Sequence, residues 1–139
     1  ITMRYLDELA DEIFAMGNCA IVGFKLGVAG IYLRTGGIDR IGQLNGLSIK
    51  SAANANQRLW HPAFEVNANG TTGAGDAAYA GLMAALIRGM DVKAAMRWSC
   101  AVGACSVEAA HASSIPTWDV IAKRLESGWR FNDSTLRHD

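Results

Sequence analysis

The spacing of hydrophobic and polar residues at the start of the chain predicts an amphipathic helix. Between Thr2 and Met16, apolar residues recur at intervals of three and four positions, and acidic residues occupy the opposite face. Gly17 is expected to end this helix. Residues 19–24 then form a short apolar run without polar alternation, which is typical of a strand buried on both faces of a parallel sheet.

Shorter patterns follow in the next third of the chain. Residues 30–34 are a second strand candidate, and a turn is expected at residues 35–37. Residues 40–57 have little periodicity and contain Asn, Ser and Gly, which indicates a surface excursion. Residues 60–66 alternate between apolar and polar positions, which predicts a half-buried strand, and Pro62 indicates that it lies at a sheet edge or a bulge.

The second half of the chain is predicted to be mainly helical. A glycine-rich segment at residues 69–76 precedes a helix over residues 77–88. Asp91 is typical of the cap of another helix, which runs to about residue 109 and carries many small residues that permit close packing. Pro116 is expected to be the first residue of a last helix. This order of elements predicts an α/β layered fold with a mainly parallel sheet and helices on both faces.

Length and composition limit the domain organisation and the partners. The 139 residues, 50% of them hydrophobic, are expected to form a single domain over residues 1–139, in which residues 130–139 are a polar tail. Thirteen basic side chains balance thirteen acidic ones. This balance argues against nucleic acid or a membrane surface as a partner and favours a small-molecule ligand. The most apolar stretch, residues 77–87, is shorter than the ~20 residues needed to span a bilayer.

Cysteine and histidine positions indicate neither a disulfide framework nor a metal site. Cys19, Cys100 and Cys105 are odd in number and form no C-x-x-C motif, so a reducing, cytoplasmic setting is expected. The three histidines stand alone without ligand spacing, and no residue is assigned to a metal. The chain opens at Ile1 in a helical pattern, which leaves open that it is the later part of a longer polypeptide.

The segment that carries chemistry is Gly-Thr-Thr-Gly-Ala-Gly-Asp at residues 70–76, between a predicted strand and a predicted helix. Unpaired N–H groups at a helix start, approached through glycines, make a ready anion site. The segment is neither a Walker loop nor a G-x-G-x-x-G turn. Asp76 would repel a bound polyphosphate unless it takes a proton from a nucleophile that attacks that phosphate. The alternative reading of Asp76 is a carboxylate that complements the helix dipole.

Residues 71–77, followed by Ala80-Gly81, resemble the carboxy-terminal signature of the PfkB or ribokinase-like family of carbohydrate kinases. The turn at residues 25–30 is similar to the family's nucleotide-lining turn. Residues 98–107 resemble its small-residue helix beside the adenine, and residues 114–116 resemble its closing segment. The resemblance covers the chain from Cys19 to about Leu125.

The resemblance implies transfer of the ATP γ-phosphoryl group to an alcohol of a sugar or sugar-like substrate, with ATP and Mg²⁺ as cofactors. Asp76 matches the catalytic base, and the segment Gly73, Ala74 and Gly75 matches the anion hole. The residues that match the nucleotide site are Lys25, Gly27, Gly30, Thr72 and Cys100.

The chain also departs from the family pattern. Gly70 stands where the family usually has Asp, which leaves its monovalent-cation site in doubt, and Lys25 stands where Thr is usual. Neither the magnesium-organising N-x-x-E element nor the glycine-rich sugar-binding sequences are found ahead of Cys19. The sequence therefore resembles roughly the second half of such a kinase.

Two other functions stay open on the sequence alone. One is a truncated or degenerate nucleotide-binding module without catalysis, and the other is a nucleoside or vitamin-precursor kinase of the same fold. The apolar helices and strands would expose a sizeable surface where the missing half should pack. A homo-oligomer or a companion amino-terminal part is therefore a further hypothesis.

Overall fold

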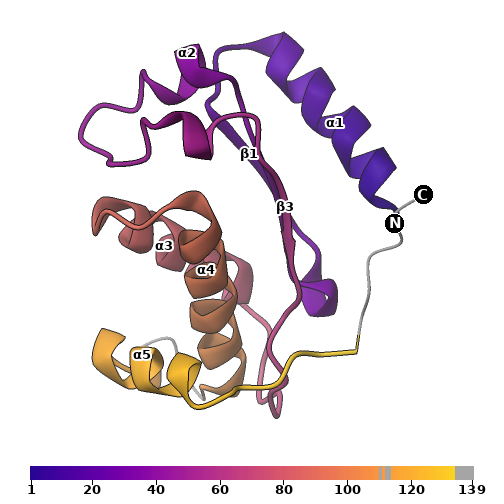
Figure 1. The fold of residues 1–139 in the computed structure, drawn as a ribbon. Helices are drawn as coiled ribbons and strands as arrows, with labels where there is room; N and C mark the ends of the chain where they lie inside the picture. Colours follow the sequence, from indigo (N-terminus) through magenta and orange to yellow (C-terminus); the bar gives the residue numbers. More distant parts are fainter. Residues whose placement is uncertain (110, 112–113, 134–139) are drawn as a thin grey trace.

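The structure is a computed structural model that describes residues 1–109, 111 and 114–133. Helix α1 lies against a sheet of three strands, and the helices α3, α4 and α5 follow in the second half of the chain (Figure 1). The principal elements are α1 (Met3–Met16), β1 (Ile21–Lys25), β2 (Ile31–Thr35), α2 (Ile38–Ile41), β3 (Arg58–His61), α3 (Ala74–Ile87), α4 (Val92–Glu108) and α5 (Trp118–Glu126). Short 3-10 turns lie at Gly27–Ala29 and Ala52–Asn54.

The sheet has the order β1-β2-β3 and both pairings are antiparallel, so the expectation of a mainly parallel sheet was wrong. Gly23 pairs with Leu33, and Leu33 pairs with Leu59. The short link between β1 and β2 explains why these two strands are antiparallel. It is only residues 26–30, whereas a parallel neighbour needs a crossover of a dozen or more residues. Within β1 only Val22 is fully buried, so this strand is not buried on both faces as predicted.

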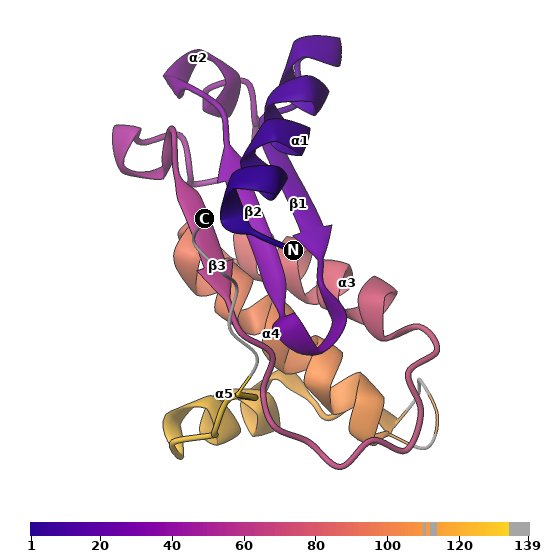
Figure 2. The ribbon, with the colours of Figure 1, turned by 90° about the vertical axis from the view of Figure 1, so that its right-hand side faces the viewer.

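Side chains of β2 alternate between two apolar clusters, as the pleat of a strand requires. Tyr32 packs with Met3 and Leu6 of α1. Ile31 and Leu33 belong to the largest cluster, which they share with residues of α3 and α4. Figure 2 shows α1 in front of the strands with α3 and α4 behind them. The predicted first helix is confirmed, and Thr2 caps it by accepting a hydrogen bond from the N–H of Tyr5.

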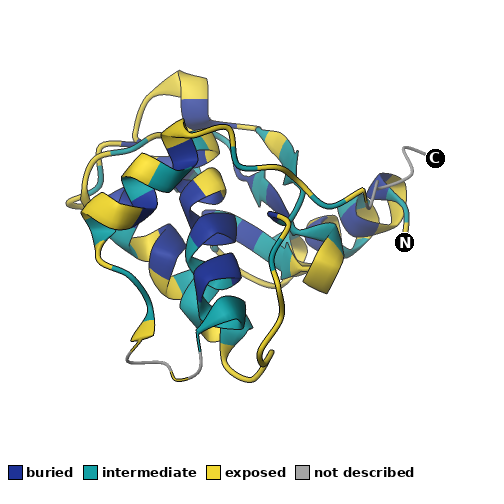
Figure 3. Cartoon of the chain, turned by 90° about the horizontal axis from the view of Figure 1, so that it is seen from below, coloured by how far each residue is buried: buried dark blue, intermediate teal, exposed yellow. Residues whose placement is uncertain are grey.

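Helices α3 and α4 pack closely along their length. Asp91 caps α4 as predicted, since its carboxylate accepts a hydrogen bond of 2.7 Å from the N–H of Ala94. A Cβ added at Gly103 would lie 3.1 Å from the Cβ of Ala78. The Ser99 hydroxyl donates to the Ala78 carbonyl at 2.7 Å. Figure 3 shows the buried residues gathered where the helices meet, and small side chains on α4 permit this close approach.

Residues 40–57 run mostly along the surface, as the sequence indicated, but a few buried side chains anchor them to the core. Ile41 and Ile49 are only 0% and 1% exposed. The buried side chain of Asn54 accepts a hydrogen bond from the N–H of Val92, and its carbonyl accepts one from the hydroxyl of Thr35. Ile41, Ile49, Asn54 and Ala55 are the buried residues of this segment, and such scattered contacts leave no periodic pattern in the sequence.

The last described residues return to the body of the molecule. Helix α5 begins at Trp118 after an N-cap at Thr117, rather than at Pro116 as predicted. Within the predicted polar tail, the N–H of Asn132 donates to Ala63, and the carbonyl of Arg130 accepts from the N–H of Glu65. Residues 134–139 lie outside the described part. Among the described helices, none is both long and apolar enough to cross a membrane.

Candidate functional site

The link between β1 and β2 is a tight turn held by its own backbone. The N–H of Leu26 donates to the carbonyl of Gly30, and the N–H of Gly30 donates to that of Gly27. Gly30 has a φ of +90°, and a Cβ there would overlap the carbonyl oxygen of His61 and lie 2.7 Å from the backbone of Pro62 and Ala63. The turn therefore presses against the end of β3, which only glycine permits.

The glycine-rich segment ends in the first turn of α3. Gly73 takes a left-handed conformation with a φ of +79° and serves as the N-cap, so α3 begins at Ala74, earlier than the predicted residue 77. The N–H of Ala74 donates to the carbonyl of Thr71, and that of Ala77 donates to Gly73. In the described part of the chain, the N–H groups of Gly75 and Asp76 have no hydrogen-bond acceptor. A helix start of this kind can bind an anion.

Lys25 stretches from the end of β1 across this helix start. Its Nζ lies 3.8 Å from Oδ1 of Asp76. A Cβ added at Gly75 would lie 2.6 Å from the same Nζ and 3.0 Å from Cδ and Cε, so the lysine stem occupies the space that this glycine leaves open. The side chain of Asp76 is 92% exposed and that of Lys25 is 38% exposed. One positive charge, one exposed carboxylate and two unpaired N–H groups therefore meet at the start of α3.

A cavity of about 430 Å³ opens beside this cluster. It brings together six of the residues that the sequence singled out, which are Lys25, Gly27, Gly30, Ala74, Gly75 and Cys100. Thr72, Gly73 and Asp76 do not line it, and all three are exposed. The structure thus places two separate stretches, the β1–β2 turn and the start of α3, on one cavity.

Several residues of the cavity wall carry no motif in the sequence. Gly103 and Ala104 stand on α4, within the stretch 98–107 that resembles the family's small-residue helix beside the adenine, although neither was a candidate site residue. Phe64 and Val66 come from the segment after β3, and Asn132 comes from the predicted polar tail. A lone asparagine near the end of a sequence has no neighbours that mark it, so only the fold could place it here.

Cys100 lies in the wall of the cavity as a buried, protonated thiol. It is 8% exposed, and its Sγ lies 3.8 Å from the carbonyl oxygen of His61. Burial raises the pKa of the Cys100 thiol to about 12, from an ordinary value of 9.0. Cys19, Cys100 and Cys105, which all lie within the described residues, have free thiols.

The raised pKa makes a prediction about alkaline stability. Between about pH 9 and pH 12 the unfolded chain ionises this thiol while the folded chain keeps it protonated, so the free energy of unfolding falls as the pH rises. The expected contribution is up to about 1.4 kcal/mol per pH unit. Urea unfolding at several pH values between 8 and 11 should therefore give a shallower decline for Cys100→Ala than for the wild type. Equal slopes would contradict the assignment.

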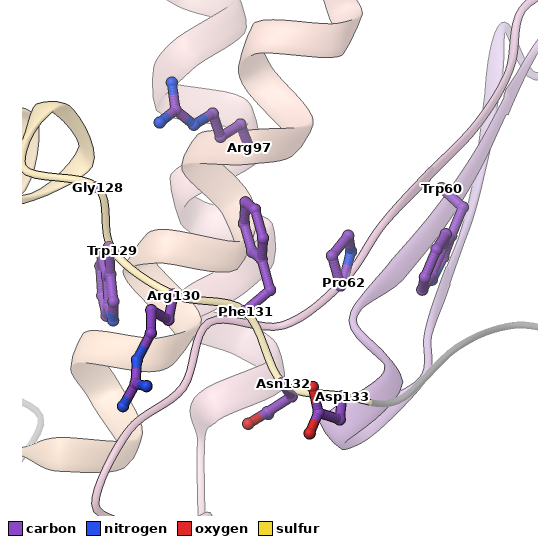
Figure 4. Close-up of a pocket in the computed structure, with 9 residues that line it drawn as sticks. All are labelled: Trp60, Pro62, Arg97, Gly128, Trp129, Arg130, Phe131, Asn132 and Asp133. Atoms are coloured by element: carbon purple, nitrogen blue, oxygen red, sulfur yellow. The ribbon is translucent and has the colours of Figure 1, made fainter.

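A second hollow, of about 650 Å³, is lined by none of the candidate catalytic or nucleotide-binding residues (Figure 4). Its two arginines are engaged within the chain. Arg97 donates to the carbonyl of Leu125 at 2.8 Å, and Nε of Arg130 lies 3.0 Å from the Glu65 carboxylate. Although this hollow is larger, the cavity beside Lys25 is the candidate site because it adjoins the unpaired N–H groups and the exposed carboxylate.

A family model described as pfkB family carbohydrate kinase matches residues 3–118 of the chain. The chain belongs to the pfkB family. The match includes the β1–β2 turn, the start of α3 and every cavity-lining residue except Asn132, and it confirms the resemblance drawn from residues 71–77.

Three known kinases illustrate what the chain is similar to. An ATP-dependent ribose-1-phosphate kinase from Halopiger xanaduensis is 42% identical over 65 residues, which cover 47% of this chain and 22% of that protein. A ribokinase structure from Thermotoga maritima superposes with a TM-score of 0.66 at 26% identity and covers 86% of this chain. An aminoimidazole riboside kinase from Salmonella enterica, solved with aminoimidazole riboside and an ATP analog, gives a TM-score of 0.57 at 28% identity and covers 77% of this chain.

The chain spans only part of the length of these three kinases. It covers 34% of the Thermotoga ribokinase, 32% of the Salmonella kinase and 22% of the Halopiger protein. The fold is therefore that of one part of a ribokinase-like kinase.

The described residues do not form a metal site of their own. No group of three or more His, Cys, Asp or Glu side chains in residues 1–109, 111 and 114–133 is placed to hold a metal ion. His61 has its pKa lowered by burial and packs against Phe64 and Phe131. His138 lies outside the described residues.

Proposed function

We propose that this chain provides the nucleotide-binding and phosphoryl-transfer part of an ATP-dependent kinase that acts on a hydroxyl of a sugar or sugar-like substrate. The observation that carries the proposal is the cavity of about 430 Å³ that adjoins the start of α3, where the exposed Asp76 and the unpaired N–H groups of Gly75 and Asp76 lie. The family match supports it, as do the words "ATP-dependent" and "ATP analog" in the names of two relatives.

The residues present fit a nucleotide. Glycines at positions 27 and 30 bring backbone close to the cavity, and apolar and small side chains line its wall, which suits a flat base. The unpaired N–H groups and the Lys25 ammonium suit the phosphates. Thr72 and Gly73, exposed just before α3, would lie near the outer phosphates. ATP would supply the γ-phosphoryl group.

The chemistry assigned to this chain is proton transfer and charge stabilisation. Asp76 would take the proton of the acceptor hydroxyl while that oxygen bonds to the γ-phosphorus and the bridging oxygen leaves with ADP. The anion hole of Gly73, Ala74 and Gly75 would donate backbone N–H groups to the charge on the transferred group. The N–H of Ala74 already donates to Thr71, so the N–H of Gly75 is the better placed donor.

Magnesium is not held by the described residues alone, since Asp76 is the single carboxylate of the cluster at the start of α3. Oxygens of the nucleotide phosphates, together with water, would therefore supply most of the ligands of such an ion. Gly70, whose N–H donates to the carbonyl of Val107, offers no side chain for a monovalent cation.

The acceptor-binding residues would come from outside this chain. One face of α3 carries an exposed residue at each successive turn, namely Asp76, Ala80, Met83 and Ile87. The Asp76 carboxylate therefore lies at the end of an exposed apolar stripe. The remaining part of a polypeptide of family length would cover this stripe and hold the acceptor near Asp76. A reducing, cytoplasmic setting is proposed because the three cysteines are free.

A panel of acceptors tests the activity. A polypeptide of family length that contains this chain is incubated with MgATP and ribose, ribose phosphates, fructose or nucleosides, and release of ADP is followed. Acceptor-dependent release supports the proposal, and the acceptor that gives it separates a sugar kinase from a nucleoside or vitamin-precursor kinase. Nucleotide binding without release for any acceptor favours the non-catalytic binding module.

A further inference from the structure

Tyr79 lies one turn along α3 from Asp76 and faces the Lys25 ammonium. The lysine Nζ lies 4.6 Å from the centre of the Tyr79 ring. The Tyr79 hydroxyl donates a hydrogen bond of 2.9 Å to the carbonyl of Gly23. This bond joins α3 to β1, the strand on which Lys25 itself stands, so the ring has a fixed position relative to the lysine backbone.

The ion pair with Asp76 is not what holds the lysine in place. The two charges are 3.8 Å apart and the carboxylate is 92% exposed, and pairs of this kind contribute little. The Tyr79 ring on one side and Gly75, over which the lysine stem lies, on the other confine the ammonium instead. An aromatic face attracts a cation through its quadrupole.

We propose that Tyr79 is a positioning residue for Lys25, holding its ammonium over Gly75 at the place where a phosphate oxygen binds. This inference rests on the proposed function, because it assumes that phosphate enters at the start of α3. A free lysine side chain loses rotamer freedom when it binds a ligand. A lysine that is already confined loses less, so confinement strengthens phosphate binding.

The hydroxyl of Tyr79 is suited to this role. Burial raises the pKa of the Tyr79 hydroxyl, so it remains a hydrogen-bond donor to Gly23 throughout the neutral range. Phenylalanine would keep the ring and lose this bond, whereas leucine would lose the attraction between ring and cation.

A double-mutant cycle on the 139-residue chain tests the inference, with MgATP and adenosine as probes in calorimetric titrations. Tyr79→Leu is expected to weaken MgATP binding by about 3- to 30-fold, the range of a cation–π contact. Adenosine, which has no phosphate, should bind equally well. In the Lys25→Met background, Tyr79→Leu should have no further effect on MgATP. Tyr5→Leu, a half-exposed tyrosine on α1, is the matched control and should leave both affinities unchanged.

The other outcomes contradict either the positioning role of Tyr79 or the proposed function. Equal losses for MgATP and adenosine, or a Tyr79→Leu loss that persists in full beside Lys25→Met, would mean that Tyr79 is merely structural. If Tyr79→Leu does not fold, Tyr79→Phe replaces it in the same cycle, with an expected loss of about 2- to 10-fold for the missing hydrogen bond. A folded wild-type chain that binds no MgATP would instead refute the proposed function itself.

Discussion

Asp76→Asn is expected to lower turnover by about 100- to 10,000-fold in a polypeptide of family length that contains this chain. The amide keeps the size of the side chain but cannot take a proton from the acceptor hydroxyl. The side chain is 92% exposed, so the substitution removes no packing. Nucleotide affinity should change little. Steady-state kinetics with MgATP, together with a binding titration of the same variant, measure both effects.

A matched substitution separates catalysis from helix electrostatics. Asp119 also stands in the first turn of a helix, α5, and is exposed. Asp119→Asn removes the same favourable interaction with a helix dipole, so it should cost a similar small amount of stability without changing turnover. Near wild-type turnover in Asp76→Asn would mean that the carboxylate only complements the helix, as the alternative reading of the sequence has it.

Gly30→Ala is expected to lower the free energy of unfolding by more than about 3 kcal/mol. The backbone at this position has a φ of +90°, and the added methyl group would lie 2.7 Å from the backbone of Pro62 and Ala63. These are main-chain atoms next to β3, so they cannot rotate away as a flexible side chain would. The substitution should also disturb the candidate site, because the β1–β2 turn lines the cavity. Urea unfolding of the chain measures the loss.

Gly46→Ala is the control for Gly30→Ala. Gly46 has a φ of +84°, but an added Cβ meets nothing within 4 Å. Its cost is the left-handed backbone alone, about 1–2 kcal/mol, partly offset by the smaller entropy of the unfolded chain. If the two variants lost equal stability, the close approach of Gly30 to the end of β3 would not matter to the fold.

The sequence was sufficient for features that depend on local chemistry. Asp91 caps the helix it was expected to cap, because a short polar side chain satisfies the first N–H groups of a helix wherever the helix packs. The residues from Gly70 to Asp76 could likewise be assigned to a helix start and to a family. Both depend on neighbours in the sequence.

Features that depend on distant contacts were missed or misread. The apolar run at residues 19–24 suggested a parallel strand, although the short link to β2 contained the signal for an antiparallel hairpin. Ile49 gave no sign of burial, because a single apolar residue in an irregular segment has no periodicity. The contact of Lys25 with Tyr79 could not be predicted either, since it joins positions 54 residues apart whose sequences carry no common motif.

The most direct test of the account is a calorimetric titration of the folded 139-residue chain with MgATP. We expect saturable binding that is weakened in Gly75→Val, because a branched side chain there would displace Lys25 and cover the unpaired N–H groups. Gly17→Val, at an extended residue where an added Cβ meets nothing within 4 Å, should bind as the wild type does. A folded chain that gives no saturable binding, or a Gly75→Val variant with unchanged affinity, would contradict the assignment of the nucleotide site.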